Sequence, residues 1–144
     1  MYSVKDILDE KGYGCTTVEP ETTVYEALKK LAGKGIGALI VLKNDRVTGV
    51  FSERDFARKT VLKGRISDDT KVEELMTEAL YTVKLTTRVI ECMELMTDKR
   101  VRHLPVLDED KLIGIVSIGD IVNKIIQDQK KHIQHLEDYI TGKS

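Results

Sequence analysis

Two short segments combine a serine with an aspartate three residues later, directly after an apolar run. Ser52 precedes Asp55 in GVFSERD, and Ser117 precedes Asp120 in GIVSIGD. This pattern is typical of a helix N-terminus, where the serine hydroxyl accepts a backbone N–H. The same position suits a ligand, because unpaired N–H groups attract phosphate oxygens and a carboxylate accepts hydroxyl donors. Capping and ligand binding are compatible, so one segment alone leaves both interpretations open.

The two segments belong to an internal repeat. A shift of 65 residues brings 17–55 onto 82–120 without a gap. About one position in three is then identical, which chance does not produce. Ser52 falls on Ser117 and Asp55 on Asp120. The chain is therefore expected to be a duplicated unit whose two pseudo-symmetric halves pack against each other.

Each copy predicts the same order of elements, β-α-β-β-α, which is an α/β fold. A short strand around 16–19, or 81–84 in the second copy, leads into an amphipathic helix. Two apolar runs follow, separated by the tetrads KNDR and DEDK, which are typical of hairpin turns, and a second helix closes the copy. The polar linker is expected to hold a short helix. We predict a first repeat at 12–65, a linker at 66–78, a second repeat at 79–129 and a helical C-terminal extension at 130–144.

With this repeat, the HLPV segment and the paired G-h-h-S-x-x-D signatures, where h is apolar, the chain resembles the cystathionine-β-synthase (CBS) domain family. Two CBS motifs in tandem form a compact pair, often called a Bateman module. The resemblance covers about Lys5 to about Gln129. It implies two clefts between the repeats, which in the family commonly bind AMP, ADP, ATP, NAD(H) or S-adenosylmethionine. It also implies a homodimer.

The resemblance further assigns roles to residues of this chain. It implies that Asp55 and Asp120 hold ribose hydroxyls. The phosphate side would be formed by Ser52, Ser117, Arg54, Arg102 and His103. The adenosine would meet backbone groups or the cleft wall at Thr16, Thr17, Gly37, Ala38, Tyr81 and Thr82.

Each basic residue also has a simpler interpretation. Arg102 and His103 fit solvated residues that enter a strand, and exposed arginines such as Arg54 are common near helix starts. The copies differ at these positions, because small Gly37-Ala38 stands opposite bulky Arg102-His103 in the alignment. We therefore expect the two clefts to differ in affinity.

Composition narrows the functional classes. The chain has 144 residues, 41% of them hydrophobic and 33% charged, and its formal net charge is -1. This balance gives no electrostatic reason to expect nucleic acid or an anionic membrane as partner. No apolar stretch approaches the length of a transmembrane helix or a signal-peptide core, so a cytoplasmic location is expected. Two cysteines give neither a disulfide framework nor a metal motif, and Cys92 is expected in the core.

The C-terminal segment carries a heptad-like seam. Its apolar positions and one glutamine are Val122, Ile126, Gln129, Ile133, Leu136 and Ile140. A helix of this length needs an apolar partner, which could be its own domain or a second copy of the chain. His132 and His135 lie in the same segment, where a metal site is disfavoured because the segment is long, polar and helical.

The leading hypothesis is a sensor of adenosyl ligands that is not an enzyme and regulates an unidentified protein in trans. No P-loop, H-E-x-x-H or nucleophile elbow is present in the sequence. Two alternatives stay open at this stage. One is an interaction or dimerisation module with empty clefts, and the other is an enzyme that acts on nucleotides.

Overall fold

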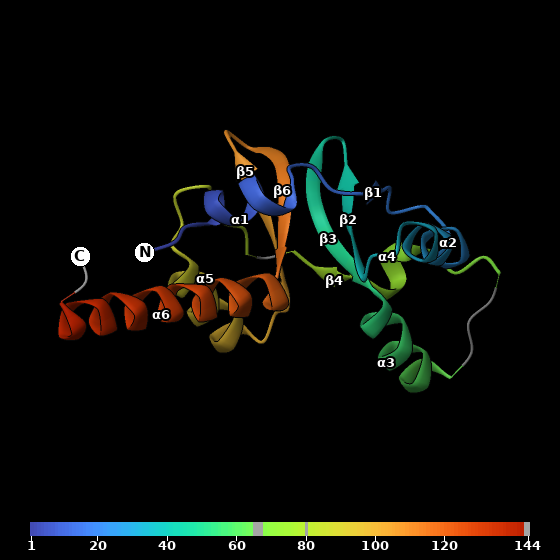
Figure 1. The fold of residues 1–144 in the computed structure, drawn as a ribbon. Coiled ribbons are helices and arrows are strands. Elements are labelled where there is room, and N and C mark those ends of the chain that lie inside the picture. The colour runs from blue at the N-terminus through green and yellow to red at the C-terminus, as the bar shows by residue number, and fades with distance from the viewer. Residues whose placement is uncertain (65–67, 80, 143–144) are drawn as a thin grey trace.

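The structure is a computed structural model that describes residues 1–64, 68–79 and 81–142. Two hairpins stand side by side at the centre, and helices lie outside them (Figure 1). The helices are α1 Val4–Lys11, α2 Val24–Lys34, α3 Glu53–Lys63, α4 Val72–Leu75, α5 Val89–Lys99 and α6 Ile118–Thr141. The strands are β1 Thr17–Val18, β2 Ala38–Lys43, β3 Arg46–Ser52, β4 Thr77–Glu78, β5 His103–Asp108 and β6 Lys111–Ser117. The fold is the predicted α/β class with two repeats and a long C-terminal helix.

The two hairpins are built alike. In each, the two turn residues adopt positive φ, with Asn44 at 52° and Asp45 at 63° in the first hairpin and Glu109 at 49° and Asp110 at 66° in the second. This backbone matches the twist of antiparallel strands, and Asn and Asp tolerate it better than most residues. Each hairpin has a register shift at the same place, between Val41 and Leu42 and between Val106 and Leu107. The hairpin turns predicted from the tetrads are confirmed.

The sheets around the hairpins differ. The first repeat forms a four-stranded sheet in the order β1-β2-β3-β4, in which β1 runs parallel to β2. In the described part of the second repeat, the sheet contains β5 and β6 alone. The strand predicted around 81–84 is therefore wrong as a strand, since this stretch makes an isolated parallel bridge between Val83 and Val106. A single bridge satisfies fewer backbone groups than a strand pair does.

The N-terminal helix α1 packs on the second repeat, and the linker helix α4 packs on the first repeat. Helix α1 contributes Val4, Ile7 and Leu8 to the core of the second repeat. Helix α4 contributes Val72 and Leu75 to the core of the first repeat. The short linker helix was predicted, whereas α1 was not. Each half is thus completed by a helix from outside the duplicated stretch.

Equivalent glycines make room for these helices. A Cβ on Gly49 would lie 2.4 Å from Met76 Sδ, just after α4. A Cβ on Gly114 would lie 3.0 Å from both methyl carbons of Leu8 in α1. Neither glycine has a positive φ, so the close approach of the neighbouring side chain explains them. The glycine of each Gly-h-h-Ser signature is therefore the residue on which α4 or α1 packs closely.

Helix α6 leaves the body of the protein after its first turns (Figure 1). Ile121 is fully buried, and the Lys124 ammonium bonds to Glu10 and lies 4.7 Å from the Tyr2 ring centroid. The apolar seam lies on another side of α6 and stays exposed, from 39% at Val122 to 81% at Ile140. The predicted long C-terminal helix is confirmed, and its seam does not fold back on its own domain.

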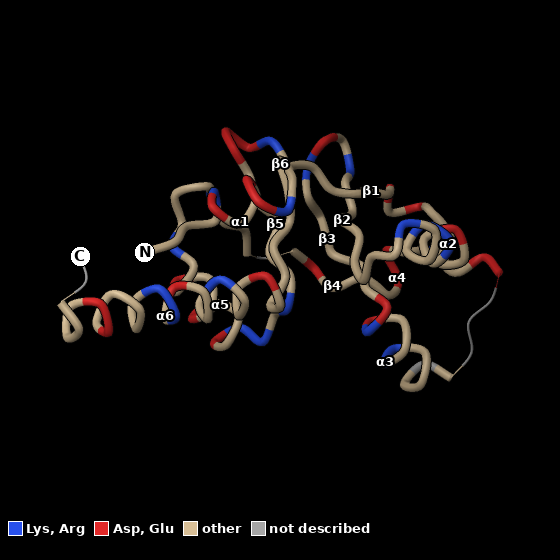
Figure 2. Tube along the Cα trace, viewed as in Figure 1, with Lys and Arg blue, Asp and Glu red and all other residues tan. Residues whose placement is uncertain are grey.

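Charges of both signs are spread over both halves of the chain (Figure 2). Among the helices of the described ranges, none is long and apolar enough to cross a membrane.

Candidate functional site

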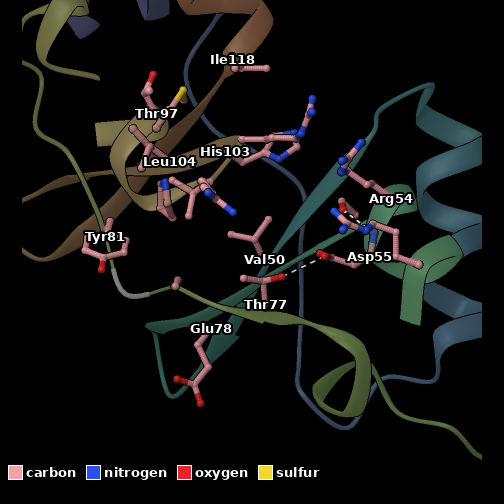
Figure 3. Close-up of a pocket in the computed structure, with 18 residues that line it drawn as sticks. Val50, Arg54, Asp55, Thr77, Glu78, Tyr81, Thr97, His103, Leu104 and Ile118 are labelled. Carbon is pink, nitrogen blue, oxygen red and sulfur yellow. Dashed lines mark hydrogen bonds between the residues drawn. The ribbon is translucent and has the colours of Figure 1, made fainter. Parts of the chain in front are cut away.

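A cavity of about 560 Å³ opens between the two repeats. Arg54 and Asp55 of α3 form one wall, and Thr97 of α5 and His103 of β5 lie across from them (Figure 3). Tyr81, which follows β4, closes a further side. This volume lies within the usual range of small-molecule sites. The cavity therefore joins side chains from both copies of the repeat.

The Asp55 carboxylate is held at the cavity with most of its hydrogen-bonding capacity free. The backbone N–H of Asp55 donates to Ser52 Oγ at 3.0 Å, so Ser52 caps α3 as predicted. The Thr77 hydroxyl donates to Asp55 Oδ1 at 3.0 Å (Figure 3). Strand β4 fixes Thr77, because it pairs with Val50 on β3. Within the described residues Asp55 Oδ2 has no partner, so it can accept hydroxyl donors from a ligand.

Basic side chains line the same cavity as this carboxylate. Arg54, Arg102 and His103, the three basic candidates from the sequence, all line the cavity. The structure adds two arginines that sequence reasoning missed, Arg58 on α3 and Arg100 at the end of α5. Guanidinium groups bind phosphate oxygens through charge-assisted hydrogen bonds.

His103 is half-buried and lies between charges of both signs. Burial lowers the pKa of its imidazole, and the Asp55 carboxylate opposes that effect. Lys11 and Arg102 lower the pKa further, while Asp120 raises it. The imidazole is therefore neutral at neutral pH, and an anion placed beside it would favour its protonated form.

The second aspartate is engaged by the protein itself. Asp120 Oδ2 accepts the backbone N–H of Ser117 at 2.9 Å and the Lys11 ammonium at 2.8 Å. The Asp120 N–H donates to Ser117 Oγ at 3.2 Å, which completes a capping box. Burial raises the pKa of Asp120, but the bonds from Lys11 and Ser117 outweigh it and lower the pKa overall. Asp120 lies in a separate small pocket with α1 and does not line the main cavity.

The remaining candidates divide between the cavity and its surroundings. Ser52 and Tyr81 line the cavity, and the Tyr81 ring lies 5.6 Å from Lys99 Nζ. The residues outside its lining are Thr16, Thr17, Gly37, Ala38, Thr82 and Ser117. The cavity thus uses the aspartate of the first copy and the basic segment of the second.

The alignment of the two copies contains a signal that could have found the two missed arginines, Arg58 and Arg100. At the shift of 65 residues, Arg54, Arg58, Arg100, Arg102 and His103 correspond to Gly119, Asn123, Gly35, Gly37 and Ala38. Each of these basic residues therefore aligns with a small or neutral residue in the other copy. A search for positions where the copies differ in charge would have found Arg58 and Arg100.

The cysteines and C-terminal histidines do not add a second site. Cys92 is fully buried, as predicted, and burial together with the neighbouring Glu91 charge raises its pKa to about 11. Burial also raises the pKa of the Cys15 thiol, so neither thiolate forms readily. His132 and His135 are exposed on α6. Among the residues that the structure describes, no three His, Cys, Asp or Glu side chains gather where they could hold a metal ion.

The family model of the CBS domain matches the chain twice, at residues 4–61 and 72–127. These matches cover more than half of the sequence, so the chain belongs to the CBS-domain family and contains two CBS domains. The first match begins with α1 and the second with α4, and each of these helices packs on the core of the other repeat.

Similar proteins share both the sequence and the fold. The mitochondrial CBS domain-containing protein CBSX3 of Arabidopsis thaliana is 39% identical, over 97% of this chain and 72% of its own. A structure of a protein with CBS domains from Burkholderia ambifaria is 49% identical, with a TM-score of 0.81 over 88% of this chain and 96% of that one. The structure of CBSX2 in complex with AMP is 29% identical, with a TM-score of 0.69 over 88% of this chain and 98% of that one.

Proposed function

We propose that this protein is a regulatory CBS pair that binds an adenosyl ligand in the cavity between its repeats. The Asp55 carboxylate carries the proposal, because it faces the cavity with a free oxygen and basic side chains line the same cavity. In the proposed complex Asp55 accepts the ribose hydroxyls, and Arg54, Arg102 and His103 face the phosphate. Similarity to CBSX2, whose structure contains AMP, supports this class of ligand.

The Ser52 cap supports the same proposal. The start of α3 lies at the cavity, and its first-turn N–H groups carry partial positive charge. Tyr81 offers an aromatic wall for the adenine base. AMP, ADP, ATP, NAD(H) and S-adenosylmethionine all contain the adenosine that this arrangement would recognise.

Ligand binding would act by population shift. A ligand that contacts α3 of the first repeat and β5 of the second favours the arrangement that offers both sets of contacts. The resulting change would be read by a separate protein in trans, and the chain itself would not catalyse a reaction. The predicted cytoplasmic location stays a prediction, because the similar protein CBSX3 is described as mitochondrial.

We further propose a homodimer in which α6 takes part. Ile133 and Leu136 are 54% and 51% exposed in the middle of its seam, and burying them in a second copy would remove apolar surface from water. Truncation after Gln127 should lower the mass measured by light scattering from dimer to monomer. A dimer that survives this truncation would assign the contact to another surface.

A thermal-shift and calorimetry panel tests the function. Adenosyl ligands should raise the melting temperature. At a ligand concentration of about one hundred times Kd, binding should increase the free energy of unfolding by about 2.7 kcal/mol. Ribose 5-phosphate and GMP serve as controls for the sugar phosphate and the base. No shift with AMP, ADP, ATP, NAD, NADH or S-adenosylmethionine would refute the proposal and favour an interaction module. Nucleotide turnover abolished by Asp55→Ala would instead identify an enzyme.

A further inference from the structure

Four arginines converge on the cavity, more than one phosphate group needs. They are Arg54 and Arg58 on α3, Arg100 at the end of α5 and Arg102 before β5. All four are exposed, and in the described part of the chain none of their guanidinium groups has an ion pair or side-chain hydrogen bond. Like charges held close together without partners repel one another. An anionic ligand would reduce this repulsion between the guanidinium groups.

The acidic residues of the cavity do not neutralise this cluster. Asp55 and Glu78 are the only two carboxylates in its lining, so four arginines leave a net charge of +2 while His103 is neutral. Asp55 accepts a hydrogen bond from Thr77, and the Glu78 side chain points away from Arg54 (Figure 3). The cavity therefore repels a cationic sulfonium and attracts an anion.

Two of the arginines lie on α3, and the other two lie in the segment that connects α5 to β5. Arg58 lies four residues after Arg54 on α3, which is about 6 Å further along the helix axis. Across the cavity, Arg100 lies two residues before Arg102. A phosphate at the capped end of α3 would meet Arg54 and Arg102. Arg58 and Arg100 would remain for a further phosphate.

The backbone at Arg100 points to the same conclusion. Its φ is 54°, in the left-handed region that favours glycine, and the equivalent residue of the first repeat is Gly35 with a φ of 62°. A non-glycine residue is strained in this conformation. The second copy accepts that strain and gains a guanidinium at the cavity, so the side chain rather than the turn explains the residue.

We propose that Arg58 and Arg100 make this cavity selective for an adenosine nucleotide with two or more phosphates. The inference rests on the proposed function, since it concerns the same cavity and its adenosine recognition. Arg54, Arg102 and the start of α3 bind the phosphate next to the ribose. Arg58 and Arg100 bind the phosphates beyond it, and a monophosphate leaves them unused.

Calorimetry with AMP, ADP and ATP in buffer with EDTA tests the selectivity. The double variant Arg58→Asn, Arg100→Gly carries the residues of the other repeat, and glycine suits the backbone of residue 100. We expect wild-type protein to bind ADP and ATP at least about tenfold more tightly than AMP, and more weakly as salt rises. The double variant should lose roughly that tenfold for ADP and ATP and keep its affinity for AMP within about threefold.

The outcomes separate the two proposals. Arg46→Gln removes an exposed arginine at the start of β3, away from the cavity, and should change no affinity. Equal affinity of wild-type protein for AMP, ADP and ATP would overturn the selectivity and leave the adenosyl site intact. An equal loss for all three nucleotides in the double variant would overturn it as well. Binding of none of them would overturn the proposed function itself.

Discussion

The two aspartates of the repeat begin from the same local structure and end in opposite situations. Both follow a serine that caps a helix, with cap distances of 3.0 Å at Asp55 and 3.2 Å at Asp120. Asp55 then turns to the cavity and bonds to a single hydroxyl of Thr77. Asp120 turns back to its own cap and to the Lys11 ammonium at 2.8 Å. The helix start is thus preserved in both copies, whereas the use of the carboxylate is not.

The residues that complete each half explain the difference. Thr77, which follows α4, is equivalent to Gly12, which follows α1, at the shift of 65 residues. The hydroxyl that orients Asp55 is therefore missing beside Asp120. Its place is taken by Lys11, one residue earlier, which supplies a positive charge from within the chain. A cation from the protein satisfies one aspartate, and the other keeps an oxygen for a ligand.

The largest expected effect concerns the helix that brings Lys11 to Asp120. Leu8 is fully buried against Gly114, so Leu8→Ala should lower the free energy of unfolding by about 2–4 kcal/mol through lost burial and a cavity. Met76, the corresponding contact of Gly49, is only partly buried, and Met76→Ala should cost less. Urea denaturation measures both. An equal or smaller loss for Leu8→Ala would mean that the deeper burial of Leu8 does not decide the difference.

The next effect tests the two carboxylates directly. Asp55→Ala should weaken adenosyl-ligand binding by roughly 10- to 100-fold, since it removes hydrogen bonds from a charged acceptor. Asp120→Ala should change the affinity by less than about threefold, because Lys11 already occupies that carboxylate. Titration calorimetry of both variants with ATP gives the comparison. A larger loss with Asp120→Ala would reverse the assignment of the ligand to the first aspartate.

Much of this comparison could be predicted from the sequence. The ungapped repeat predicted both hairpins, both caps and the Ser52–Asp55 pair, because these features are local and recur in register. The candidates Arg54, Arg102 and His103 came from the resemblance to the CBS family. Helix α1 was missed, since it lies outside the aligned stretch and is stabilised by packing on the distant second repeat. The Lys11–Asp120 pair depends on that packing across 109 positions, so no local pattern indicates it. Arg58 and Arg100 were missed because the search favoured similarity between the copies.

A smaller effect comes from His103, which has Ala38 as its counterpart. A bound phosphate would raise the pKa of His103, which burial lowers in the free protein, so binding is coupled to proton uptake. Affinity should therefore rise severalfold as the pH falls from about 7.5 to about 5.5. Asp55, Lys11, Asp120 and Arg102 also act on this imidazole.

The variant His103→Ala isolates this contribution. Phosphates of the ligand titrate in the same range, with a second pKa near about 6, but they do so equally for both proteins. The difference in pH dependence between wild type and His103→Ala therefore reports the imidazole alone. Calorimetry of ATP binding at several pH values measures it. Parallel pH profiles for the two proteins would remove His103 from the phosphate side.

The smallest expected effect is the contribution of the Lys11–Asp120 ion pair to stability. Lys11→Met should lower the free energy of unfolding by only about 1 kcal/mol, because the pair is partly exposed to water. The pKa of Asp120 is lowered in the folded protein, so the pair stabilises it above the ordinary aspartate pKa of 3.8. This stabilisation is lost as the pH falls below that value, and the difference between wild type and Lys11→Met should then close. Lys5→Met is the matched control, since its pair with Asp9 at 2.7 Å is more exposed. Urea denaturation at pH 7 and near pH 3 decides the outcome, and a gap that persists at low pH would mean that Lys11 stabilises α1 through its bond to the Ile115 carbonyl instead.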